Sequence, residues 1–277
     1  SFTYGMGVAE KETFPGRLRA LLGPGVEVIN AGMLGSGPFS QRKCFRDLLA
    51  CRPKVVILGA LINDAVDAER EAAERRKHGP RHGEPTRFSR GVGWLRDHTA
   101  LQPFLYTLHQ RMKGMPYPFD HRDVTWEQLR KQKFDHYNAT LERGTWETLV
   151  FPAWLEIEKE CRQRGISFMI VVFPVDVQLW ESNAGAPQIC AIQKRIAEFA
   201  ADEQISSCDL TPAFRKATQS GELRLMYGEA ETLRLQSRLF TESPPALFLN
   251  DGHPSPFGYA IAAEKVHAHL AEHALLR

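Results

Sequence analysis

The sequence predicts an α/β fold built on an open, doubly wound parallel sheet. Three runs of apolar residues have the length of buried strands, at residues 54–59, 166–173 and 205–209. Two stretches of helical length, about 145–164 and 187–203, stand between or beside them. Strands that alternate with helices of about 10 to 20 residues form right-handed βαβ units, which pack helices on both faces of a parallel sheet.

The N-terminal part of the chain offers a further helix, strand and helix. The first helix is expected from about Thr13, because Thr13-Phe14-Pro15 supplies an N-cap and an early proline, and 23–25 (Gly-Pro-Gly) ends it. Residues 26–29 are expected to form a short buried strand. A glycine-rich loop follows at 30–37, and then a helix from about 40 to 50.

Residues from about 65 to 144 interrupt this alternation, since they are rich in charge and contain a helical stretch at about 94–113. We expect an inserted helical cap there. Residues 222–243 are charged and are expected to be helical in part, and a last helix follows the loop 250–258. The simplest organisation is a single domain over residues 1–277 that carries one helical insertion.

The composition excludes several classes of function. The 35 Lys and Arg residues nearly balance the 33 Asp and Glu residues, and the formal charge of +2 is too small for a chain that binds nucleic acid through phosphates. No stretch approaches the roughly 20 apolar residues of a membrane-spanning helix. With 43% hydrophobic residues the chain can bury a large core, so a soluble globular domain is expected.

Polar and small residues gather where the predicted strands end. The loop after 26–29 carries Gly35, Asn63 follows the strand at 54–59, and Asp251 and His253 precede the last helix. Ligands of open α/β sheets bind at the carboxyl ends of the strands. A carboxylate two residues from an imidazole suits a base and its orienting group, because the carboxylate holds the Nδ1 proton and leaves Nε2 free.

A serine stands at the start of the chain, in a turn that contains small residues. Four segments, 1–5 (Ser-Phe-Thr-Tyr-Gly), 30–35 (Asn-Ala-Gly-Met-Leu-Gly), 62–64 (Ile-Asn-Asp) and 251–254 (Asp-Gly-His-Pro), resemble in order and spacing the four sequence blocks of the SGNH hydrolase family, also called GDSL esterases and lipases. The similarity extends over nearly the whole chain outside the insertion.

The resemblance implies a flavodoxin-like three-layer α/β/α sandwich with a central parallel sheet, the SGNH hydrolase fold, and a helical insertion. It implies Ser1 as nucleophile, His253 as general base and Asp251 as the residue that orients it, with Gly35 and Asn63 as oxyanion-hole donors. It implies no metal and no organic cofactor. Acyl transfer places negative charge on a carbonyl oxygen, and each preorganised donor to that oxygen is worth roughly 3 to 4 kcal/mol.

The sequence departs from the family pattern at two places. The family commonly has its acid three residues before the histidine, where this chain has Asn250, so the acid role falls to Asp251. The family serine follows Gly-Asp at the end of an apolar strand, whereas this sequence begins at Ser1. We therefore expect the first strand of the sheet to precede residue 1, together with any signal or membrane anchor. Bacterial cytoplasm and periplasm both stay open as locations.

The expected activity is that of a serine esterase, which cleaves a carboxylic ester through an acyl-serine intermediate. A small-molecule ester, a lipid and an O-acylated glycan all stay open as substrates, and the sequence does not indicate the oligomeric state. Three alternatives stay open as well. These are an acyltransferase that delivers the acyl group to a sugar or alcohol, an amidase that uses the Ser1 amine as its base, and a non-catalytic binding module.

Overall fold

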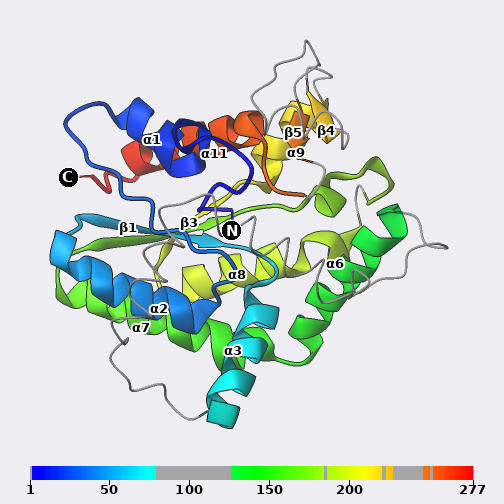
Figure 1. Ribbon diagram of the computed structural model, residues 1–277, viewed down its shortest axis with the longest axis horizontal. Helices are drawn as coiled ribbons and strands as arrows, with labels where there is room; N and C mark the ends of the chain where they lie inside the picture. Colours follow the sequence, from blue (N-terminus) through cyan, green and yellow to red (C-terminus); the bar gives the residue numbers. More distant parts are fainter. Residues whose placement is uncertain are drawn as a thin grey trace, which may run out of the picture. The chain divides into compact units, whose positions relative to one another are not determined.

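The computed structural model describes residues 2–78, 126–183, 186–219, 223–226, 246–249 and 252–276. The chain divides into two compact units, Ser1–Glu71 with Lys133–Arg277, and Ala72–Gln132. The first unit has an α/β fold that is mostly helical and holds a small parallel three-stranded sheet flanked by helices (Figure 1). The helical stretch expected at 94–113 lies outside the described residues.

The three strands expected from apolar runs are confirmed. They are β1 (Val55–Ala60), β2 (Ser167–Val172) and β3 (Ser206–Asp209). They lie in the order β1-β2-β3, and both pairs are parallel. Their apolar character follows from their position, because a parallel sheet with helices on both faces is buried on both faces.

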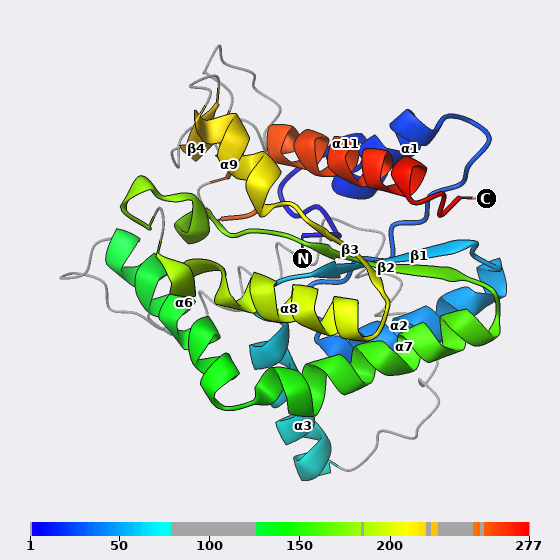
Figure 2. The same cartoon turned by 180° about the vertical axis from the view of Figure 1, so that it is seen from behind.

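The helices of the first unit cover both faces of this sheet, as Figures 1 and 2 show from opposite sides. On one face lie α2 (Pro38–Leu48), α7 (Phe151–Gln163) and α8 (Ala191–Asp202), and on the other α1 (Phe14–Leu22), α9 (Thr211–Gln219) and α11 (Pro256–Glu272). Alternate residues of β2 pack against the helices on opposite faces of the sheet. Ile170 packs with the first set of helices and Val171 with the second.

Other helices and short turns complete the described part. The longer ones are α3 (Asp64–His78) and α6 (Trp126–Glu142). Single 3₁₀ turns span Glu10–Glu12, Leu49–Cys51, Asp176–Leu179, Glu181–Asn183 and Pro187–Cys190, and a π-helical turn spans Trp146–Val150. Among the described helices, none combines the length and the apolar character needed to cross a membrane.

Local capping explains where the confirmed helices begin. The side chain of Thr13 accepts a hydrogen bond from the Gly16 amide at 3.1 Å, so it caps α1 as the sequence predicts. Prolines occupy the first turn of α2 and α11. These helices therefore start at Pro38 and Pro256, slightly before the expected starts, because proline is pre-organised for the first helical position.

One predicted element is wrong. Residues 26–29 form no strand and are not buried, since Ile29 is 47% exposed. A strand needs a paired neighbour, and among the described strands β1 pairs with β2 alone. Within the segment 222–243, which is expected to be helical in part, Arg224–Met226 form strand β4, which pairs with the buried strand β5 (Ala246–Phe248). Residues 227–245 lie outside the described residues, so the expected helical part of this segment stays a prediction.

Candidate active site

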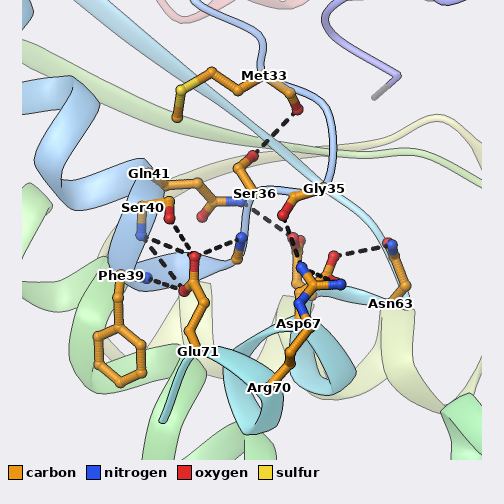
Figure 3. Close-up of polar contacts among 12 residues, drawn as sticks. Met33, Gly35, Ser36, Phe39, Ser40, Gln41, Asn63, Asp67, Arg70 and Glu71 are labelled. Atoms are coloured by element: carbon orange, nitrogen blue, oxygen red, sulfur yellow. Dashed lines mark hydrogen bonds and ion pairs between the residues drawn. The ribbon is translucent and has the colours of Figure 1, made fainter. Parts of the chain in front are cut away.

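The loop that carries Gly35 is attached to the first turns of α3 (Figure 3). The guanidinium of Arg70 donates to the Gly35 carbonyl oxygen at 2.7 Å and pairs with the carboxylate of Asp67 at 2.8 Å. Gly35 has a φ of +62°, in the left-handed region that favours glycine. Arg70 thus fixes the turn from which the Gly35 amide projects.

Asn63 joins the same network from the residue directly before α3. Its Nδ2 donates to the carboxylate of Asp67 at 3.1 Å. Asp67 therefore connects Asn63 to Arg70, and Arg70 connects both to Gly35. A side-chain amide carries two N–H donors, and one donor of Asn63 is used for this contact, while the described residues give the second no hydrogen-bond partner. Gly35 and Asn63, predicted from separate sequence blocks, are brought together.

The carboxylate of Glu71 holds the rest of this loop. It accepts hydrogen bonds from the backbone amides of Gly37 at 3.1 Å and Phe39 at 3.0 Å, and from the hydroxyl of Ser40. These groups belong to the first turn of α2, where a negative charge is favourable. A Cβ on Gly37 would lie 2.7 Å from the Glu71 carboxylate, so only glycine allows this close approach.

Asp64 lies buried beside Asn63 and stabilises the turn between β1 and α3. Its carboxylate accepts from the Leu61 amide at 2.8 Å and from Nε2 of Gln41 at 3.1 Å. Gln41 in turn accepts from the indole N–H of Trp154 at 3.0 Å. Burial raises the pKa of Asp64 to about 7, and burial also raises the pKa of Asp67. Burial in the folded chain therefore makes the two carboxyl groups Asp64 and Asp67 harder to ionise than in the unfolded chain.

The loop that carries His253 folds back over β5. The Leu249 amide donates to the His253 carbonyl at 2.8 Å, the Gly252 amide donates to Leu249 at 3.0 Å, and the Ser255 amide donates to Leu247 at 2.8 Å. Gly252 has a φ of +86°, which allows the reversal. Three backbone hydrogen bonds therefore fix the position of the histidine.

The N-terminal segment lies against this histidine. The ring of Phe2 packs on the imidazole of His253 with 5.4 Å between centroids, and on Phe173 with 5.8 Å. The residue that follows Ser1 in the chain thus contacts the predicted base. Ser1 and Asp251 themselves lie outside the described residues, so their predicted roles stay predictions.

Asp67, Arg70 and Glu71 are site residues that the sequence reasoning missed, because it assigned everything from about residue 65 to the insertion. A signal was present in their spacing. Counting from Asn63 they follow at i+4, i+7 and i+8, and residues at such intervals share one face of a helix. A helix that begins directly after a predicted site residue and carries charged side chains on the same face indicates that those side chains support the site.

The described residues contain no group of three or more His, Cys, Asp or Glu side chains placed to hold a metal ion. Compared with protein-family models, with curated proteins and with solved structures, the chain has no match.

Proposed function

We propose that this protein is a serine esterase of the SGNH hydrolase type, with a flavodoxin-like sandwich fold, and that it cleaves a carboxylic ester through an acyl-serine intermediate. The observation that carries the proposal is the shared network of Gly35 and Asn63 at the carboxyl end of β1. The contact between Phe2 and His253 adds a second link between predicted blocks. The segments that make these contacts are far apart in the sequence, so the fold and not the local chain brings them together.

The proposed reaction uses groups from each segment. Ser1 Oγ attacks the ester carbonyl while Nε2 of His253 takes its proton, and Asp251 orients the imidazole through Nδ1. The oxygen of the tetrahedral intermediate accepts hydrogen bonds from the Gly35 amide and from Asn63 Nδ2. Collapse breaks the ester C–O bond and the alcohol leaves with the proton from His253. Water then attacks the acyl-serine by the same route, which returns free Ser1.

The donor geometry supports an oxyanion hole in particular. Within the described part of the chain the amide of Gly35 makes no hydrogen bond, while its carbonyl is held by Arg70. Asn63 is held through Asp67. Donors whose own orientation is fixed by neighbours need no reorganisation during the reaction, and this preorganisation is the main source of electrostatic catalysis.

The test is labelling with a fluorophosphonate probe followed by peptide mass spectrometry. We expect the adduct on the peptide that contains Ser1, and its loss in Ser1→Ala. Ser36→Ala is the matched control, since within the described residues its hydroxyl donates to the Met33 carbonyl of the same loop at 3.3 Å and to no other group. Labelling elsewhere, or no labelling together with no turnover of esters of short, long and sugar-linked acyl groups, contradicts the proposal. Transfer of the acyl group to added alcohols in preference to water selects an acyltransferase.

A further inference from the structure

The C-terminal end of α11 carries two histidines one helical turn apart. His269 and His273 are the first and last residues of the segment 269–273 (His-Leu-Ala-Glu-His). The His273 amide donates to the His269 carbonyl at 3.1 Å, so the helical spacing extends to His273 and both side chains share one face of the helix. The two imidazole rings stack there, with 4.1 Å between their centroids and 19° between their planes. Solvent reaches the pair, since His269 is partly buried and His273 is exposed.

This spacing suits the coordination of one metal ion. Two histidines at positions i and i+4 on one face of a helix are a recurrent pair of zinc ligands. A ring nitrogen binds Zn²⁺ at about 2.0 to 2.1 Å, so two nitrogens on one ion lie at most about 4 Å apart. The rings of His269 and His273 are already this close. Rotation of the two side chains, without movement of the helix, therefore brings one nitrogen of each ring to a shared ion.

A residue of β3 holds one of the two rings. Nε2 of His269 and Oγ of Ser206 share a hydrogen bond of 2.7 Å. When Nε2–H donates to this hydroxyl, Nδ1 keeps its lone pair, and the described residues give Nδ1 no hydrogen-bond partner. A histidine that binds a metal almost always donates its other ring N–H to a neighbouring acceptor, which fixes its tautomer and orientation. Ser206 stands in the position of such an acceptor.

The local charges favour a neutral imidazole and a bound cation. Burial and the neighbouring His273 lower the pKa of His269, and the carboxylate of Glu272 opposes this change. His269 is therefore neutral at pH 7, and metal ions bind the neutral form. Glu272 also places a negative charge near the pair. The C-terminus of a helix carries a partial negative charge, so the end of α11 attracts a cation as well.

We propose that His269 and His273 bind Zn²⁺, with water in the remaining coordination positions and Ser206 as the hydrogen-bond partner of His269. Imidazole suits zinc, whereas Mg²⁺ and Ca²⁺ prefer oxygen ligands. The pair lies away from the candidate active site, because Ser206 begins β3 level with Ile57 of β1, while Asn63 follows the carboxyl end of β1. The zinc site does not depend on the proposed esterase activity.

The test is a titration with zinc chloride, followed by the ring-nitrogen NMR signals of ¹⁵N-labelled histidine. We expect the signals of His269 and His273 to shift together to one saturating midpoint, and magnesium chloride to leave them unchanged. His273→Gln, which replaces an exposed side chain, weakens this binding by more than about tenfold, and Ser206→Ala weakens it by about tenfold. His267→Gln is the matched control, because residues two apart on a helix do not share a face.

Separate midpoints for His269 and His273, or wild-type affinity in His273→Gln, overturn the proposal. Wild-type affinity in Ser206→Ala overturns the role of Ser206. The thermal midpoint gives a second measurement, since an ion that binds only the folded chain stabilises it. Zinc should raise the midpoint of wild type and His267→Gln by the same amount and that of His273→Gln by less. An equal rise in His273→Gln places the zinc at another group, such as the exposed Cys51, and also overturns the proposal.

Discussion

The two sides of the candidate site are held in place by different forces. On the side of the proposed oxyanion donors, called the oxyanion side below, Gly35 and Asn63 are connected by the charged side chains of Asp67 and Arg70. On the histidine side, backbone hydrogen bonds tie the loop around His253 to β5. Charged contacts respond to pH and ionic strength, whereas a backbone ladder responds mainly to steric change. The two sides are therefore separable by experiment.

Chain connectivity explains the difference. His253 follows the end of β5 by only five residues, so the chain can return on itself and pair its own backbone. Gly35 and Asn63 belong to segments separated by α2 and β1. No local turn brings them together, and side chains from α3 bridge the gap. We expect each substitution described below to disrupt one side of the site and leave the other side intact.

The largest effect is expected for Asn63→Ala on the oxyanion side. Removal of one oxyanion donor lowers kcat about 10² to 10³-fold with little change in KM, because the donor acts mainly on the transition state. Steady-state ester hydrolysis measures it, with Ser36→Ala as the control in the facing loop. A loss of less than about fivefold in a folded variant contradicts the role of Asn63.

The next effect is a dependence of stability on pH that originates at Asp64. Its pKa is about 7 in the folded chain because of burial, and near 4 when unfolded. Between these values the folded state holds a proton that the unfolded state has lost, so the contribution of Asp64 to stability is greatest below pH 4 and falls as the pH rises to 7. The expected loss is on the order of 3 kcal/mol.

Urea unfolding of wild type and Asp64→Asn at intervals from pH 4 to pH 8 measures this loss. The variant has no titrating group at this position, so its free energy of unfolding should fall less steeply over the same interval. Parallel curves for the two proteins would show that Asp64 is ionised in both states.

On the histidine side, Gly258→Ala tests the steric sensitivity of the backbone ladder. A Cβ at Gly258 would overlap the carbonyl oxygen of Leu247, which accepts from Ser255 in the ladder next to His253. We expect a loss of about 2 kcal/mol in the free energy of unfolding. Gly25→Ala is the matched control, since no atom lies within 4 Å of its added Cβ. Equal stability of the two variants contradicts this expectation.

The sequence predicted the elements that depend on local or continuous patterns. The apolar runs at β1 and β2 identified buried strands, and Thr13 identified the start of α1. The prediction of a strand at residues 26–29 was wrong for a nonlocal reason. Their apolar character is that of a strand, but strand formation depends on a neighbouring strand, and no described strand pairs with them.

The residues of the candidate site also divide into those that local sequence patterns predict and those that depend on distant contacts. Gly35, Asn63 and His253 could be predicted because each follows or precedes a recognisable element. Asp67 and Arg70 were not, because their role depends on α3 contacting a loop about 30 residues earlier in the chain. Their helical spacing from Asn63 was visible, but the surface that this face contacts was not.

The smallest effect is expected for Arg70→Gln, and it measures how far the oxyanion side depends on charge. Arg70 is about half exposed, so its pair with Asp67 is worth about 0.5 kcal/mol and is weakened by salt. We expect a two- to threefold lower kcat at low ionic strength and convergence with wild type in about 1 M salt. Arg46→Gln, which removes an exposed pair with Glu160, should leave kcat unchanged. A salt-independent loss in Arg70→Gln would instead assign the effect to the hydrogen bond on the Gly35 carbonyl, because a neutral partner cannot be screened.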